Sequence, residues 1–224
     1  MARVRFSSML DAGSGVVGNS VIARGKSGYQ VRARPKPKYR PTPNQAASMA
    51  RMTQASQAWN ELTRAQAEAW NHFAEGITKA GFTAGQRYSP TGHNLFTAYG
   101  SKLLQLNPLA TLPIWPPAER FTPDCVVLSA SAGGGVPAGT VRVTSDRENT
   151  PGTVVELLVQ KLKNERAAPG ERYYTNAFVS FESGAMSYDL PLGAGWWALA
   201  HREVDAATGQ QTGIMPFGVV EIPS

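Results

Sequence analysis

The spacing of apolar residues changes along the chain, and the first regular pattern is helical. Apolar side chains recur at helical spacing in three stretches, residues 43–60, 64–78 and 92–106. Thr42 and Thr63 are each followed three residues later by glutamine, which is the pattern of a capping box. Ser-Pro-Thr at 89–91 is a further helix start. We therefore expect a small segment of three helices.

Beyond residue 120 the apolar pattern becomes that of β-strands. Turn signals rich in glycine and proline separate seven short β-prone runs: 125–129, 140–144, 153–161, 172–181, 186–190, 196–204 and 219–222. About seven short strands in about 100 residues are typical of an immunoglobulin-like or fibronectin-like (Ig/FN3-like) fold. We expect a C-terminal antiparallel β-sandwich without the Cys-Trp-Cys pattern of antibody domains.

The N-terminal part combines β-prone runs with a proline-rich segment. Residues 20–24 and 29–34 are joined by Gly-Lys-Ser-Gly, which predicts a β-hairpin with a four-residue loop. This hairpin has few large apolar residues and needs a partner surface to be stable in water. Prolines at 35, 37, 41 and 43 predict an extended connector.

These patterns predict an α+β protein with four parts. They are a basic extended arm (1–41), a helical segment (42–107), a proline-rich linker (108–120) and a β-sandwich domain (121–224). The apolar residues of the linker suggest that it packs against another part of the protein.

The charge of the chain is concentrated in the arm. The net charge of the 224 residues is +6, and nine basic residues against Asp11 give residues 1–41 a charge of +8, which leaves −2 for the rest. Such an arm favours a polyanion or an acidic protein surface as its contact. Its candidate interaction residues are Arg3, Arg5, Arg24, Lys26, Arg32, Arg34, Lys36, Lys38 and Arg40.

Four tryptophans are further candidates for interaction. Trp59 and Trp70 lie on the first two predicted helices and form either the core of the helical segment or an interface anchor. Trp196 and Trp197 are neighbours in a predicted strand, so their side chains face opposite sides. We expect one to fill the sandwich core and the other to be exposed or covered by a neighbouring subunit.

The sequence contains no recognisable catalytic constellation. Neither a nucleophile elbow nor a complete phosphate-binding loop is present, and the three histidines lack metal-ligand spacing. The single cysteine, Cys125, is expected to be a buried, inert thiol. No apolar run is long enough to span a membrane, and no signal-peptide core follows the first residues. We expect no enzyme activity, cofactor, metal or membrane partner, and synthesis in a host cytoplasm.

The N-terminal half resembles a group of uncharacterised structural proteins encoded by tailed phages and prophages. The resemblance rests on the basic segment 29–35, the Thr-Pro-Asn-Gln cap at 42–45, the tryptophan-containing run 58–70 and Gly-His-Asn-Leu-Phe at 92–96. It implies a virion component, capsid-associated, decoration, tail or neck, whose partners are other virion proteins in a homo-oligomer or a hetero-assembly. A nucleic-acid-binding protein that uses the basic arm, and a carbohydrate- or receptor-binding module, remain as alternatives.

Overall fold

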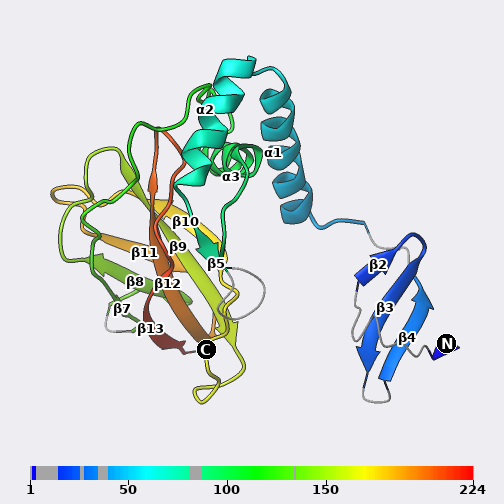
Figure 1. Ribbon diagram of the computed structural model, residues 1–224. Helices are drawn as coiled ribbons and strands as arrows, with labels where there is room; N and C mark the ends of the chain where they lie inside the picture. Colours follow the sequence, from blue (N-terminus) through cyan, green and yellow to red (C-terminus); the bar gives the residue numbers. More distant parts are fainter. Residues whose placement is uncertain are drawn as a thin grey trace. The chain divides into compact units, whose positions relative to one another are not determined.

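The protein consists of two compact units, Met1–Asn44 and Gln45–Ser224. The computed structural model describes residues 2–3, 15–25, 28–34, 40–80, 87–133 and 135–223 (Figure 1). The boundary between the units lies three residues beyond the predicted end of the arm at residue 41. The helices, the 108–120 connection and the sandwich, which the sequence suggested as separate parts, share the second unit.

The first unit contains a four-stranded antiparallel sheet in the order β1–β4–β3–β2. Its strands are β1 (Ala2–Arg3), β2 (Gly15–Val17), β3 (Ser20–Gly25) and β4 (Gly28–Ala33). The predicted hairpin is confirmed, because β3 and β4 pair from Ser20 with Ala33 to Gly25 with Gly28. Both strands extend through these glycines, so only two residues connect them and the predicted four-residue loop is wrong.

The described part of the chain has three helices, α1 (Pro43–Asn60), α2 (Arg64–Glu75) and α3 (Gly92–Leu106). Their starts agree with the predicted caps at α2 and α3. The Thr63 hydroxyl accepts from the Gln66 backbone N–H while the Gln66 side chain accepts from the Thr63 N–H, and Thr91 accepts from the Asn94 N–H. The predicted end of the second helix at residue 78 is wrong, because Gly76 is its C-cap and glycine continues a helix poorly.

All seven predicted strands of the C-terminal domain are present. They are β7 (Leu128–Ser131), β8 (Thr140–Ser145), β9 (Thr153–Leu162), β10 (Tyr174–Val179), β11 (Ser187–Pro191), β12 (Gly195–Asp205) and β13 (Met215–Ile222). They form two sheets, β10–β9–β12–β13 and β11–β8–β7, whose facing side chains share one apolar core. The fourth strand of the domain, β10, pairs with β9 rather than with β11, so the strand order differs from that of a constant-type immunoglobulin domain.

Two predicted strand starts are wrong by three or more residues, each for a physical reason. The first strand begins at Leu128 and not at residue 125, because side chains rather than a strand ladder bind the preceding backbone at Val126. Cys125 therefore precedes the strand, and it is half-buried rather than buried. The last strand begins at Met215, four residues earlier than predicted, because Pro216 is tolerated on a strand at the edge of its sheet.

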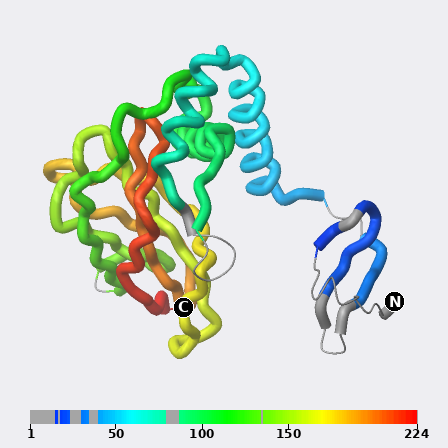
Figure 2. Tube along the Cα trace, in the orientation of Figure 1, coloured from blue at the N-terminus to red at the C-terminus, as the bar shows by residue number. Residues whose placement is uncertain are grey.

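Helix α3 packs on the outer face of the larger sheet through Lys102, which binds Glu156 of β9. Figure 2 traces β9 and β12 side by side through this unit, in agreement with their antiparallel pairing. Both faces of β9 are covered, since Leu157 lies in the sandwich core and Glu156 on the opposite face is also fully buried. In the second unit, α3 thus lies on one side of the four-stranded sheet, and the three-stranded sheet lies on the other.

Candidate functional site

The N-terminal sheet carries apolar side chains on both faces, and none of its described side chains is buried. Ile22 pairs with Val31 on one face, while Val16 and Val21 pair on the other. Val21, Ile22 and Val31 are half-buried, and Val16 is 54% exposed. A sheet of this kind has little hydrophobic stabilisation of its own, so a surface that covers it would add a large share of its stability.

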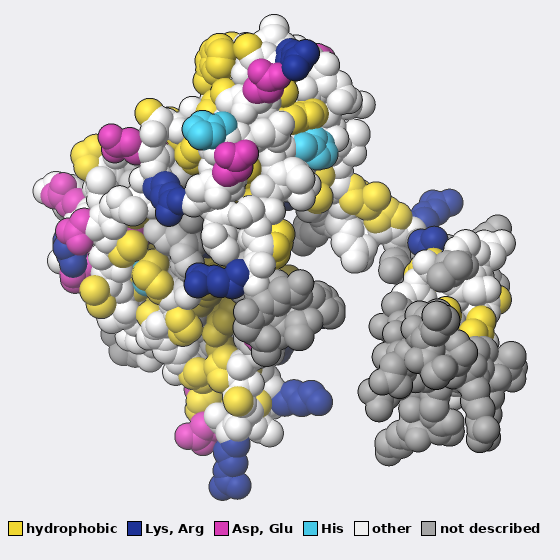
Figure 3. All heavy atoms as spheres, viewed as in Figure 1, with side chains coloured by type: hydrophobic (Ala, Val, Ile, Leu, Met, Phe, Trp, Pro, Cys, Tyr) yellow, Lys and Arg dark blue, Asp and Glu magenta, His cyan; other side chains and the backbone are white. Residues whose placement is uncertain are grey.

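The structure describes five of the nine basic residues that were predicted to make contacts. The side chains of Arg32, Arg34 and Arg40 are exposed. For Arg3 and Arg24 the structure describes the backbone, within β1 and β3. The remaining candidates lie outside the described residues: Arg5, Lys26, Lys36 and Lys38. In the second unit, the Lys and Arg side chains on the face seen in Figure 3 stand apart from one another with acidic side chains among them.

The rings of Trp59 and Trp70 both pack against Phe96 of the third helix rather than against each other. The Trp59 and Trp70 rings lie 5.5 and 5.4 Å from the Phe96 ring, both edge-on. Trp70 is fully buried, and its indole N–H donates to the carbonyl of Ile114 at 3.3 Å. Trp70 is therefore a core residue that also fixes the 108–120 connection onto the helices, whereas Trp59 is half-buried.

Trp196 and Trp197 point to opposite faces of β12, as the strand period predicts, but neither is fully buried. Trp197 packs against the sandwich core, and its indole N–H donates to the Gly193 carbonyl at 3.1 Å. Its cross-strand partner is Lys161, whose ammonium lies 5.4 Å from the ring centroid. Both tryptophans lie near the start of the strand, at one end of the sandwich, which leaves each of them partly exposed to solvent.

The connection after α3 presents an apolar surface that the sequence indicated only by its composition. Leu112 packs into the helical core, while Ile114 and Trp115 are each about half exposed, at 51% and 53%. A half-exposed tryptophan beside other apolar groups is typical of a protein contact surface.

A buried ionic cluster joins α3 to the sheet. The Glu156 carboxylate is fully buried on β9; it accepts from Lys102 of α3 at 3.0 Å and from Arg202 of β12 at 2.6 Å. Thr175 of β10 donates a further hydrogen bond to it. Burial alone would raise the pKa of Glu156, but the Arg202 hydrogen bond, the Lys102 charge and the Thr175 hydroxyl outweigh it and lower that pKa. The cluster is a structural connection between the helical layer and the sheet.

A second buried polar pair holds the chain just before β7. The imidazole Nε2 of His201 lies 3.2 Å from the Val126 carbonyl oxygen, and the Glu203 carboxylate accepts from the Val126 N–H at 2.7 Å. Both side chains are buried. Burial raises the pKa of Glu203 and lowers the pKa of His201. The hydrogen bonds with the Val126 backbone shift each pKa in the opposite direction, but by less.

The lowered pKa of His201 predicts that this histidine contributes a loss of stability as the pH falls, opposite in sign to the contribution of Glu203, whose pKa is raised. The unfolded chain takes up a proton on this histidine below about pH 6.5, and the folded protein resists it, so the contribution of His201 to stability falls as the pH drops below that value. The loss approaches about 1.4 kcal/mol per pH unit. The free energy of unfolding, measured in urea, should fall less steeply between pH 7 and 5 in His201→Gln than in the wild type. His72→Gln, at an exposed histidine, is the matched control. An equal flattening of its pH dependence would contradict the assignment of the effect to His201.

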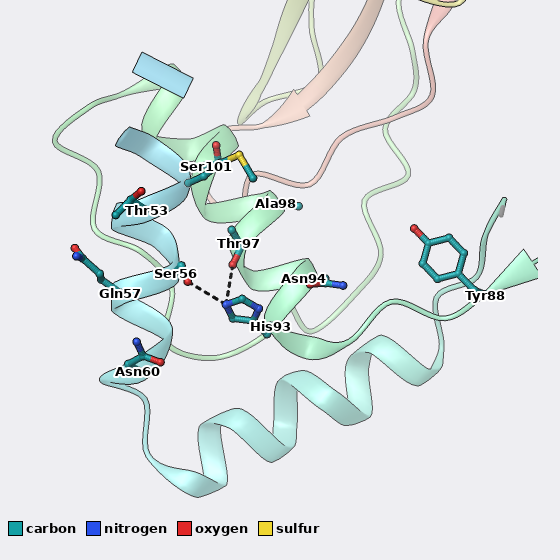
Figure 4. A pocket seen from close by; sticks show the side chains of 11 residues that line it. Thr53, Ser56, Gln57, Asn60, Tyr88, His93, Asn94, Thr97, Ala98 and Ser101 are labelled. Carbon is teal, nitrogen blue, oxygen red and sulfur yellow. Dashed lines mark hydrogen bonds between the residues drawn. The ribbon is translucent and has the colours of Figure 1, made fainter. Parts of the chain in front are cut away.

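A groove of about 720 Å³ lies beside α1 and α3. It is lined by Met52, Thr53, Ser56, Gln57 and Asn60 of α1, Tyr88, and His93, Asn94, Thr97, Ala98 and Ser101 of α3. The His93 Nε2 lies 3.2 Å from the Ser56 hydroxyl and 3.5 Å from the Thr97 hydroxyl (Figure 4). Sequence reasoning missed this site, because polar residues on exposed helix faces give no signal until two helices bring them together.

Comparison with known proteins gives no relative on which to base an assignment. No family model, curated protein or solved structure matches the chain. No helix in the described residues is long and apolar enough to cross a membrane. Across the same parts of the chain, no three His, Cys, Asp or Glu side chains are grouped so as to hold a metal ion.

Proposed function

We propose that the chain is a non-enzymatic structural component of a phage virion that attaches to neighbouring subunits through its N-terminal sheet. The observation that carries the proposal is the sheet itself, which forms a unit of its own with apolar side chains on both faces and no buried side chain among those described. Such an element is stabilised by what it binds.

The charge distribution supports the same conclusion. Residues 1–41 carry +8 and the rest of the chain −2. Exposed arginines at 32, 34 and 40 would attract an acidic surface, while the edge strand β2 offers backbone groups for strand addition. The second unit contains its own apolar core and supplies the independently folded bulk. The resemblance of the N-terminal half to phage and prophage structural proteins indicates a virion as the setting.

Deletion of residues 1–41 should abolish incorporation into particles. Mass spectrometry of purified particles should detect the full chain and not the truncated one, because the attachment element has been removed. Circular dichroism and thermal unfolding of the truncated protein should show that the second unit remains folded. Glu221→Ala, at an exposed position of β13, should be incorporated like the wild type. Normal incorporation of the truncated chain would reject the proposal.

Nucleic-acid binding is a second candidate function, supported by the +8 charge of the arm. The same measurement separates it from subunit attachment if DNA-filled and empty particles are compared. Attachment to protein subunits predicts equal incorporation into both kinds of particle. Incorporation only into filled particles would assign the arm to DNA.

A further inference from the structure

We propose that the groove beside α1 and α3 binds a neutral saccharide, a function separate from attachment through the N-terminal sheet. None of the eleven lining residues carries a carboxylate, ammonium or guanidinium group. Apart from the imidazole of His93, the groove therefore offers no group that could act as a counter-charge to an ionic ligand. Its volume of about 720 Å³ falls within the range of small-molecule sites, about 300–1,000 Å³.

The groove presents hydrogen-bonding groups that the fold does not use. The carboxamides of Gln57, Asn60 and Asn94 make no side-chain hydrogen bond to any described protein group. Each carboxamide has donors and an acceptor, and a sugar hydroxyl likewise donates and accepts. An apolar ligand would cover these groups without satisfying them, which is unfavourable. A polyhydroxylated neutral ligand can satisfy several of them at once.

His93 gives the groove a fixed centre. Figure 4 shows Ser56 and Thr97 converging on its ring from α1 and α3. The Trp59 ring contacts the imidazole edge-on at 5.5 Å. These contacts hold the imidazole and both hydroxyls in place before a ligand arrives, which reduces the entropy lost on binding.

Tyr88 supplies the apolar component that sugars require. Its side chain is 49% exposed at the groove, and Asn94 points toward it in Figure 4. The negative face of an aromatic ring attracts the C–H groups on the apolar face of a sugar ring. A peptide, in contrast, would need several apolar pockets for its side chains, and Met52 and Ala98 are the only aliphatic lining residues.

Isothermal titration of the full chain with neutral trisaccharides tests the proposal. Maltotriose, cellotriose and chitotriose are the probes, with sialyllactose as the charged comparison and tetra-alanine as the peptide comparison. We expect at least one neutral trisaccharide to bind with a Kd of about 1 mM or tighter. Asn60→Ala and Asn94→Ala should each weaken it between about twofold and tenfold, the effect of one lost hydrogen bond.

The matched control is Gln54→Ala, which removes a carboxamide from the same helix α1 outside this groove. It should bind like the wild type. The proposal is overturned if none of the three trisaccharides binds, if tetra-alanine binds in their place, or if the double variant Asn60→Ala/Asn94→Ala keeps wild-type affinity. These variants leave the N-terminal sheet intact, so incorporation into particles should be unaffected whichever result is obtained.

Discussion

Glu156→Ala should lower the free energy of unfolding by about 3–5 kcal/mol, because it leaves Lys102 and Arg202 as charges without their carboxylate partner. The Lys102 side chain is 9% exposed and that of Arg202 18%, so water cannot readily replace the lost partner. Burial already lowers the pKa of Lys102 despite the neighbouring carboxylate. With a denaturant slope of about 2 kcal/mol per molar urea, the unfolding midpoint should fall by roughly 2 M.

Urea titration of the full chain, followed by tryptophan fluorescence and circular dichroism, measures this change. Glu221→Ala is the control, since Glu221 is an exposed carboxylate in the same sheet, and its midpoint should move little. A Glu156→Ala protein that unfolds like the Glu221→Ala protein would show that the cluster is not a stabilising connection.

Gly209→Ala should destabilise the second unit by about 3 kcal/mol or more, through two independent effects. The backbone φ of Gly209 is +74°, a conformation that residues with a side chain adopt at a cost of about 1–3 kcal/mol. A Cβ atom there would also lie 2.3 Å from the Tyr99 carbonyl oxygen of α3 and 2.9 Å from the Leu103 side chain. The turn after β12 could not then keep its close contact with the helix.

Two further glycines separate these effects. Gly184 has a φ of +83° but no atom within 4 Å of an added Cβ, so Gly184→Ala should show the backbone cost alone. Gly213 has open space and no positive φ, so Gly213→Ala should be nearly neutral. We expect thermal midpoints to fall in the order Gly213→Ala, Gly184→Ala, Gly209→Ala. Equal midpoints for Gly209→Ala and Gly184→Ala would contradict the close approach of the turn to α3.

Local signals in the sequence were sufficient to predict the three helices and the seven strands of the sandwich, but not the short strands Lys79–Ala80 and Arg87–Tyr88, which pair with each other. The capping box at Thr63 and the cap at Thr91 place two helix starts correctly, because these hydroxyls satisfy backbone N–H groups within a few residues. The seven strands follow from their period and from the glycine turns between them. The predicted strand bounds are wrong where contacts with distant residues determine the structure. Val126 is an example, because its backbone is bound by side chains 75 and 77 residues further along the chain.

The layering of helices on the sheet could not be predicted in this way. In the sequence, Lys102 occupies what looks like an ordinary polar position of a helix. Glu156 lies within the apolar run of β9. Their pairing spans 54 residues and becomes apparent only when helix and strand are brought together. The groove has the same origin, since its carboxamides and His93 belong to two helices that are 32 residues apart in the sequence, from Asn60 to Gly92.

The charged contact between α3 and the sheet affects how uniquely the helix is positioned on the sheet. Apolar surfaces can slide over one another at little cost, whereas Glu156 bonds Lys102, Arg202 and Thr175 at once in only one setting of the helix. Replacing the ionic groups together with apolar residues of similar size can leave stability unchanged or raise it. We expect α3 to be oriented less uniquely in such a protein, because apolar contacts alone do not require one position of the helix on the sheet.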